Sequence, residues 1–274
     1  MSDQRIWVSA LQERGLSERR ACRVLAIERN SIRYTPAPED PINTALRPVL
    51  GRLVARHRRF GSPRLTWRVQ RDGWAVNHKR VERLYAEAGW QIPRRRKRPR
   101  AVGPRWVRTP RAQGPNDVWA MDFVHDQTVT GTKLKCLAVV DEGGHECLEL
   151  RVDWRLRSRD VLETLDELVQ ERGVPQYLRT DNGPEFIAEE LRTWAASQGI
   201  RIAYTDPGSP WQNGIVESFN GKLRDECLNG EVFWSRTEAQ VVLDRWRDEY
   251  NRERPHRSLG MRTPAEVAAA HGID

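Results

Sequence analysis

Three acidic residues in the second half of the chain have the side-chain type and local setting that metal-dependent chemistry requires. Asp122 lies in the apolar run Val118-Trp-Ala-Met-Asp-Phe-Val124. Asp181 opens Asp-Asn-Gly-Pro-Glu-Phe, directly after Gln-Tyr-Leu-Arg-Thr, and Glu217 lies where a helix is expected to begin. Three such carboxylates can hold two Mg²⁺ ions, and two such ions suit the cleavage and transfer of phosphodiesters.

The segment around Glu217 reads as a helix with two different faces. Ser209 and Pro210 occupy the cap and first-turn positions that start helices. The apolar face consists of Val216, Phe219, Leu223 and Cys227. The polar face consists of Asn213, Glu217, Gly221 and Arg224. This polar face therefore combines an acid, an amide, a cation and, at Gly221, a position without a side chain. Such a face suits contact with a metal, a scissile phosphate and the adjacent DNA backbone.

Two glycines weaken this expected helix. Gly214 and Gly221 each cost on the order of 1 kcal/mol of helix stability. A DNA backbone that approaches the helix closely explains them, and close packing of another helix is the alternative.

The residues alone leave the acid set open. Asp-Asn-Gly also commonly makes a hairpin turn, so a turn without any catalytic role is an alternative interpretation of the segment at Asp181. Asp126 points to the same strand face as Asp122, and Asp141 ends the neighbouring apolar run. Composition and periodicity do not choose between Asp122 and these two competitors.

Charge divides the chain into a basic arm and an acidic body. The net charge of +8 is the sum of +18 over residues 1–115 and −10 over residues 116–274. The arm is suited to neutralising phosphates, and the body to collecting carboxylates that bind divalent cations. Nucleic acid is the partner that this asymmetry favours over a simple solvated surface.

The arm contains two helix-turn-helix outlines. In residues 16–35, Ser17 caps an expected helix, and a second short helix begins near Asn30 or Ser31. A second unit covers residues 44–90, with one helix from Pro63 to Asp72 and another after the cap residue Asn77. The residues of this last helix expected to contact DNA, rather than solvent alone, are Lys79, Arg80 and Arg83.

Residues 93–111 form an expected basic linker. They lack periodicity and contain several prolines, eight Arg and one Lys. A block of like charge does not pack, but it can lie along a phosphate backbone. The candidate DNA contacts here are Arg94, Arg95, Arg96, Lys97 and Arg98.

From residue 116 the pattern changes to alternating strands and helices. Three apolar runs at 118–124, 135–140 and 147–152 predict neighbouring strands joined by hairpins. A helix capped by Ser158, a strand at 177–180, a helix ended by Gly199 and a strand at 200–204 follow. The pattern predicts an α/β sheet covered by helices.

Longer motifs in this body resemble the transposases of bacterial insertion sequences that share the retroviral-integrase catalytic core. The matching segments are Trp119-Ala-Met-Asp-Phe, Thr180-Asp-Asn-Gly-Pro-Glu-Phe, Ser209-Pro-Trp-Gln-Asn-Gly-Ile-Val-Glu-Ser-Phe-Asn and the tail Tyr250-Asn-Arg-Glu-Arg-Pro-His-Arg. Thirty-five residues separate Asp181 from Glu217, the spacing typical of that family. The N-terminal Leu-Ser-Glu-Arg-Arg-Ala-Cys-Arg is similar to the second-reading-frame product of these elements.

The resemblance implies an RNase H-like catalytic core, a mixed five-stranded sheet flanked by helices, behind an all-α helix-turn-helix region. It implies that Asp122, Asp181 and Glu217 are catalytic and hold two Mg²⁺ ions, with Mn²⁺ as a substitute. The implied reaction is 3′-end cleavage and strand transfer, without a protein nucleophile. Lys222 and Arg224 are expected to hold DNA beside the site.

A structural zinc site is not expected. Cys22, Cys136, Cys147 and Cys227 include no close Cys-x-x-Cys pair, and His57 and His78 lack a suitably spaced Cys pair. His256 lies in the matching tail, where packing or a DNA-backbone contact is expected rather than chemistry.

The expected domains are a helix-turn-helix segment at 1–40, a second one at 41–92, a linker at 93–114, the catalytic core at 115–230 and a helical extension at 231–274. The expected partners are the element's terminal inverted repeats, target DNA, further copies of the chain on DNA and an upstream-frame fusion segment. A cytoplasmic, nucleoid-associated protein without a membrane span is expected. A binding-only regulator and a nuclease that cuts without joining are the competing functions.

Overall fold

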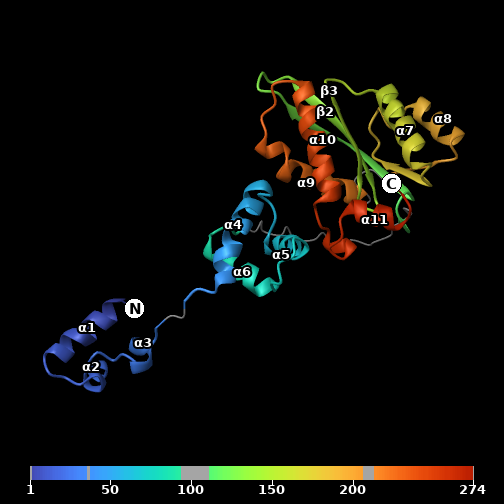
Figure 1. Cartoon of the computed structure of the whole chain (residues 1–274). Helices are drawn as coiled ribbons and strands as arrows, with labels where there is room; N and C mark the ends of the chain where they lie inside the picture. Colours follow the sequence, from blue (N-terminus) through green and yellow to red (C-terminus); the bar gives the residue numbers. More distant parts are fainter. Residues whose placement is uncertain (1, 36–37, 94–110, 206–212, 274) are drawn as a thin grey trace. The chain divides into compact units, whose positions relative to one another are not determined.

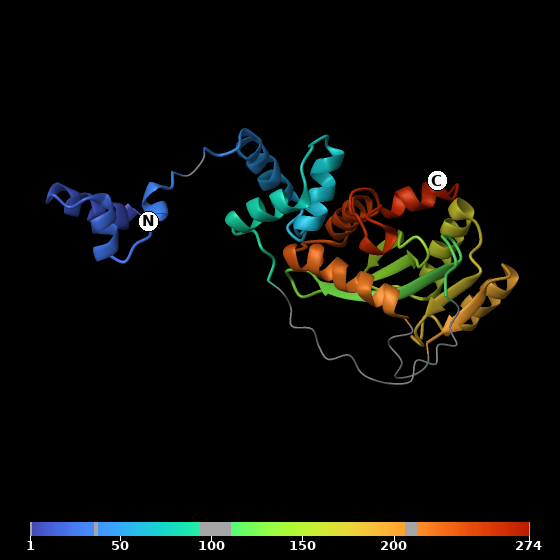
Figure 2. The same cartoon turned by 90° about the horizontal axis from the view of Figure 1, so that it is seen from below.

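The computed structural model describes most of the chain and divides it into two compact units (Figures 1 and 2). The units are Met1–Val49 and Leu50–Asp274, and each is taken by itself. The described residues are 2–35, 38–93, 111–205 and 213–273.

Three short helices build the first unit, α1 (Ser2–Glu13), α2 (Glu18–Val24) and α3 (Arg29–Arg33). The Ser17 hydroxyl accepts a hydrogen bond from the Arg20 N–H at 3.3 Å, so the predicted cap of α2 is confirmed. Small apolar side chains fill the space between the helices, chiefly those of Val8, Ala21 and Cys22. The helix α4 (Pro41–Arg56) runs across the boundary between the two units.

The second unit begins with a helical pair, α5 (Ser62–Arg71) and α6 (His78–Glu87). Between them Gly73 has φ +91°, a left-handed conformation that favours glycine, and so ends the first helix as predicted. The predicted cap of α6 is also confirmed, because the Asn77 side chain accepts from the Arg80 N–H at 2.9 Å. The buried face of the pair includes Leu65, Val69, Val81 and Leu84.

A mixed five-stranded sheet forms the centre of this unit, in the order β3-β2-β1-β4-β5. The first three strands pair antiparallel, whereas β4 and β5 run parallel to β1, as the predicted fold requires. The strands are β1 (Val118–Gln127), β2 (Lys133–Asp141), β3 (Cys147–Asp153), β4 (Tyr177–Thr180) and β5 (Arg201–Tyr204).

Helices cover both faces of the sheet (Figures 1 and 2). On one face, α7 (Ser158–Arg172) and α8 (Glu189–Ser197) pack on residues such as Trp119 and Met121. The predicted cap of α7 was wrong by one position. Ser158 is the first helical residue, and Arg157 is the cap, whose backbone N–H donates to the Asp160 carboxylate at 2.7 Å.

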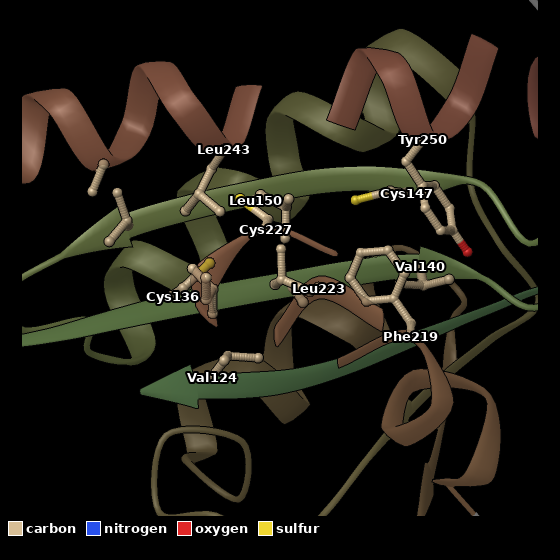
Figure 3. Packing of buried hydrophobic residues seen from close by; sticks show 14 of the residues in the cluster. Val124, Cys136, Val140, Cys147, Leu150, Phe219, Leu223, Cys227, Leu243 and Tyr250 are labelled. Atoms are coloured by element: carbon tan, nitrogen blue, oxygen red, sulfur yellow. The ribbon is translucent and has the colours of Figure 1, made fainter. Parts of the chain in front are cut away.

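The other face is covered by α9 (Gly214–Glu226) and α10 (Arg236–Arg252), as Figure 3 shows for their shared core. Val124 and Leu150 of the sheet meet Phe219 and Leu223 of α9 and Leu243 of α10 in one cluster. The apolar stripe predicted for α9 is therefore the buried stripe. It fixes the rotation of α9 and hence the direction of its polar side chains.

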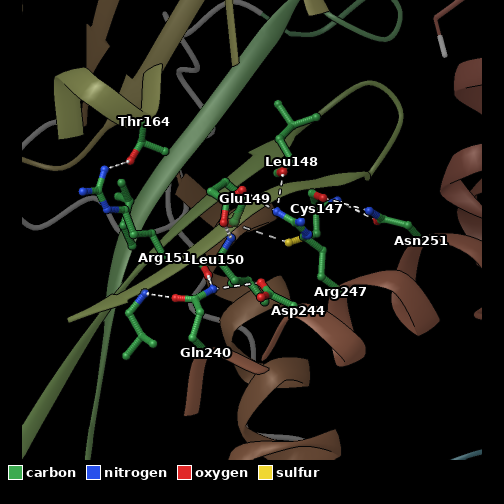
Figure 4. A network of polar contacts seen from close by, with 12 residues as sticks. Cys147, Leu148, Glu149, Leu150, Arg151, Thr164, Gln240, Asp244, Arg247 and Asn251 are labelled. Atoms are coloured by element: carbon green, nitrogen blue, oxygen red, sulfur yellow. Dashed lines mark hydrogen bonds and ion pairs between the residues drawn. The ribbon is translucent and has the colours of Figure 1, made fainter. Parts of the chain in front are cut away.

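Side-chain amides of α10 satisfy the free backbone groups of the edge strand β3 (Figure 4). The Gln240 amide donates to Leu150 O at 2.7 Å and accepts from Val152 N at 2.8 Å. The Asn251 amide brackets Cys147 in the same way, at 2.8 and 2.9 Å. These side chains bond backbone groups of β3 that a further strand would otherwise bond. They thereby hinder this edge from pairing with another chain.

The chain continues from α10 to the short helix α11 (Pro264–Ala270), which Thr263 and Glu266 begin with a reciprocal capping box. All four cysteines are buried and free. Within the described part of the chain, no helix combines the length and the apolar character needed to cross a membrane.

Candidate active site

The parallel register of β1 and β4 brings Asp122 and Asp181 to neighbouring positions. Val118 pairs with Tyr177 and Ala120 with Arg179, an offset of 59 residues. The same offset relates Asp122 to Asp181, which directly follows the last residue of β4. The two carboxylates, 59 residues apart in sequence, therefore come from adjacent strands of the sheet.

Asp122 is held in place on the α9 side of the sheet. Its Oδ2 accepts a hydrogen bond from the Asn220 amide at 2.8 Å, and its Oδ1 accepts from the Phe123 N–H at 2.8 Å. Burial raises the pKa of Asp122, and the charge of Asp181 raises it further. The site therefore favours a cation that would restore the ionised form.

The loop after β4 is anchored at several of its residues, while Asp181 itself stays exposed. The Asn182 amide donates to Thr205 O at 2.8 Å, Glu185 forms an ion pair with Lys135, and Phe186 is buried. The Asp181 carboxylate accepts from the Gly183 N–H at 2.9 Å, and a Cβ on this glycine would lie 3.0 Å from Asp181 Oδ1. Asn182, Gly183, Glu185 and Phe186 thus each help to fix the loop that carries Asp181.

Glu217 reaches the same region from the first turn of α9. Its neighbours Val216 and Phe219 are buried, while Glu217 itself is exposed. Burial raises the pKa of Glu217, and the charge of Asp122 contributes to the shift. The described helix begins at Gly214, and the expected start residues Ser209 and Pro210 lie outside the described residues.

The two competing aspartates have different surroundings. Asp141 is only 3% exposed and accepts backbone N–H groups of Asn116, Gly143 and Gly144, so it ties the turn after β2. Asp126 lies on the same face as Asp122 but farther along β1, where its charge acts on Cys227 at the other end of α9. Neither environment brings the carboxylate toward Asp181.

The three predicted acids approach one another without forming a closed ligand set. In the residues that the structure describes, no three His, Cys, Asp or Glu side chains are close enough together to hold a metal ion. The mutual effects on pKa link Asp122 to both Asp181 and Glu217. All the donors are carboxylate oxygens, which is the chemistry that Mg²⁺ prefers.

The predicted DNA contacts on α9 differ in exposure. Asn213 directly precedes α9, makes no capping hydrogen bond with its side chain and is only 5% exposed, whereas Arg224 is exposed and donates to His125 O at 2.8 Å. Lys222 is half-buried and donates to Ser218 Oγ at 3.2 Å. A Cβ at Gly214 or Gly221 would meet no described atom within 4 Å, so packing against described residues does not explain these glycines.

The predicted contacts in the arm fall into two groups. Lys79 and Arg83 are exposed on α6, and Arg80 is half-buried beside them. Arg94, Arg95, Arg96, Lys97 and Arg98 lie outside the described residues.

Arginines near α5 meet carboxylates of the sheet-bearing part of the same unit. Arg59 pairs with Asp225 at 2.7 Å, and Arg56 pairs with Glu253 at 2.7 Å. Arg71 also forms an ion pair with Glu266. These pairs are partly solvent-exposed, so each one contributes at most about 1 kcal/mol.

Sequence reasoning missed two polar groups that position the acids. Asn220 lies one turn after Glu217, and this helical spacing could have suggested its contact with Asp122. The buried pair Arg179–Glu142 joins β4 to the end of β2 at 2.6 Å. No local pattern signals that pair, because its partners are 37 residues apart.

Comparisons with known proteins agree with this architecture. The integrase core domain family matches residues 112–210 and 198–264, and an HTH-like domain matches residues 43–98. A 31.7 kDa protein of insertion element IS407 from Burkholderia multivorans is 42% identical over 266 residues, which cover 96% of this chain and 95% of that protein. Transposase InsF of insertion sequence IS3A from Escherichia coli is 25% identical over 80% of each chain.

A solved structure supports the fold itself. A chain of the simian T-cell lymphotropic virus intasome, in complex with PP2A regulatory subunit B56 gamma, has a TM-score of 0.52. The match covers 80% of this chain and 73% of that chain at 20% sequence identity. The chain belongs to the family of insertion-sequence transposases that carry an integrase core domain.

Proposed function

We propose that this protein is a DNA transposase that cleaves the 3′ ends of an insertion-sequence element and transfers them to a second DNA. Asp122, Asp181 and Glu217 are its proposed catalytic residues. The observation that carries the proposal is the register of β1 and β4, which sets Asp122 beside Asp181 on the face where Glu217 approaches. The family membership supports the same reaction class.

Two Mg²⁺ ions fit the donor set, because all three proposed ligands are carboxylates, and burial and a neighbouring acid raise the pKa of both Asp122 and Glu217. When bound, such ions supply acidity to an attacking hydroxyl group and stabilise charge on the departing oxygen. The protein's own task is to orient the ligands. Asn220 fixes Asp122, and the anchored loop after β4 fixes Asp181.

DNA contact is proposed for two surfaces. The exposed Lys79 and Arg83 lie on α6, the second helix of a helix-turn-helix pair, which is the helix that enters the major groove in such motifs. Arg224 is proposed to hold backbone phosphate near the acids, and the residues 94–98 to contribute charge. The empty space beside Gly221 allows a DNA backbone to approach α9 closely.

The decisive experiment uses DNA carrying the terminal inverted repeats that flank the gene. Incubation with Mg²⁺ should give 3′-end cleavage followed by joining, and Asp181→Asn should abolish both. Cleavage without joining would identify a nuclease, and binding without cleavage would identify a regulator. Either result would overturn the proposal.

Assembly on DNA is a further part of the proposal. Joining two ends to one target requires more than one active site, so several copies of the chain are expected to act together. An upstream-frame segment fused to this chain is the proposed additional partner. Full end-specific activity from this polypeptide alone would remove the need for that segment.

A further inference from the structure

Basic side chains from three separate segments gather around one carboxylate at the second half of α9. The carboxylate is Glu226. Arg254, which follows α10, binds it with two hydrogen bonds, from Nε at 2.7 Å and from Nη2 at 2.5 Å. Arg64 of α5 places its Nη1 3.8 Å from the same carboxylate. Lys222 lies one helical turn before Glu226 on the same face of α9.

The cluster holds more positive than negative charge. Arg254 and Glu226 neutralise each other, with side chains only 5% and 13% exposed. The neighbouring Asp225 is already paired with Arg59. Arg64 and Lys222 are therefore left without a carboxylate of their own among the described residues, which gives the cluster a surplus of two positive charges.

This surplus is unfavourable without a further anion. Lys222 is half-buried, and burial together with the charge of Arg254 lowers its pKa to about 8. The same causes lower the pKa of Arg64 to about 10. Partly desolvated cations are normally paired, so the cluster favours binding of an anion that both cations can share.

The surroundings show where such a partner can bind. Arg254 is the buried member of the cluster, and the buried His256 places its Nε2 3.4 Å from Arg254 Nη1. Lys222 and Arg64 are the more exposed members, and Gly221 beside Lys222 leaves open space. Arg64 is held in position by the Phe60 ring, 5.4 Å from its guanidinium carbon.

We propose that Lys222 and Arg64 together bind one backbone phosphate of DNA, supported from below by the Arg254–Glu226 pair. This inference rests on the proposed function, because it takes DNA as the substrate. Lys222 is five residues beyond Glu217, which is about 7.5 Å along the helix axis and about 140° around it. The phosphate at Lys222 is therefore a separate contact, on a different side of α9 from the acids.

The test measures binding of duplex DNA to the full chain over a range of salt concentrations. Loss of one phosphate contact should reduce the slope of log affinity against log salt by about 0.9. Lys222→Met and Arg64→Met should each reduce the slope measurably, by part of that amount. The double variant should lose about one contact rather than two, because both residues bind the same phosphate.

Lys133→Met is the matched control, because Lys133 is an exposed lysine on β2 outside the cluster. It should leave the affinity and the slope close to wild type. Lys222→Arg should restore the slope lost in Lys222→Met, which separates lost charge from lost folding. An unchanged slope in Lys222→Met, or a loss of two contacts in the double variant, overturns the proposal.

A second arm separates this site from the proposed function. Inorganic phosphate should raise the thermal midpoint of the wild type and not of Lys222→Met, whether or not the protein cleaves DNA. Asp181→Asn should bind DNA with the wild-type slope while lacking cleavage. Wild-type protein that is stabilised by phosphate but inert toward DNA would refute the transposase proposal and retain the anion site. Equal stabilisation of Lys222→Met by phosphate would refute the anion site.

Discussion

The two halves of α9 carry opposite charge imbalances. In the first half, Glu217 faces Asp122, and each carboxylate has a raised pKa because burial and the other acids disfavour ionisation. In the second half, the positive charges outnumber the carboxylates, because Lys222 and Arg64 have no carboxylate of their own among the described residues. One helix thus presents excess negative charge near its start and excess positive charge near its end, on different sides of the helix.

This difference indicates two ligands rather than one. Surplus carboxylates favour a divalent cation, and surplus partly buried cations favour a phosphate. A metal-dependent enzyme acting on DNA needs both, at a separation that one helix can fix. The buried stripe of α9 against β1 and β2 provides that rigidity.

The largest effect is expected from the first half's acid set. Asp181→Asn removes one proposed metal ligand and should lower cleavage and joining by at least ~10³-fold, because metal ions contribute several kcal/mol to such reactions. Asp248→Asn is a suitable control, since Asp248 is exposed on α10. Equal loss in both variants, or normal activity in Asp181→Asn, would break the assignment.

The largest effect on the free energy of unfolding is expected from the Arg254–Glu226 pair at the second half of α9. Arg254→Met leaves Glu226 largely buried without its main partner and should lower the free energy of unfolding by about 3 kcal/mol. Chemical denaturation of variant and wild type measures this difference. A loss below about 1 kcal/mol would mean that solvent or Arg64 replaces Arg254, and the cluster would then not be built around this pair.

A smaller effect is expected in how protein stability depends on pH, through Asp122 at the first half of α9. Because the pKa of Asp122 is raised in the folded protein, its ionisation costs stability as pH rises from about 4 through the raised value. Asp122→Asn lacks this cost, so its stability relative to wild type should increase with pH over that range. Other buried acids, such as Glu142, cancel in the difference.

Mg²⁺ should reduce this pH-dependent difference, because a bound cation favours the ionised Asp122 of the wild type. Thermal unfolding at several pH values, with and without Mg²⁺, makes the comparison. A difference that is flat with pH would show that burial and the charge of Asp181 do not raise the pKa of Asp122.

The smallest effect is expected for the exposed ion pairs next to the cluster. Arg59→Met breaks the pair with Asp225, whose side chains are 39% and 29% exposed, and should change stability by less than about 1 kcal/mol. The same denaturation assay used for Arg254→Met applies. A loss as large as that of Arg254→Met would erase the distinction between buried and exposed pairs in this half of α9.

Local patterns predicted most of the elements, because helix caps and apolar periodicity act over short distances. Ser17 and Asn77 cap helices as expected, and the stripe through Phe219 and Leu223 is buried. Periodicity alone did not separate Asp122 from Asp126 and Asp141. The strand register and the turn-forming bonds of Asp141 distinguish their surroundings, and both depend on tertiary structure.

The cluster around Glu226 could not have been predicted from sequence. Arg64 precedes Glu226 by 162 residues and Arg254 follows it by 28, so no window of sequence contains the set. The sequence did mark His256 as a member of a family motif. In the structure, burial and the charge of Arg254 lower the pKa of His256 to about 2, so it is a neutral packing residue beneath the cluster.

The most direct test of the two-ligand account compares Glu217→Gln with Lys222→Met in their response to Mg²⁺ and to DNA. The measurement is the shift in thermal midpoint that each ligand causes. In Glu217→Gln, the shift caused by Mg²⁺ should be mostly lost, while the shift caused by DNA without metal should remain. In Lys222→Met, the shift caused by Mg²⁺ should remain, while the shift caused by DNA should be smaller. Loss of both responses in the same variant, or of neither response in either variant, would contradict the account.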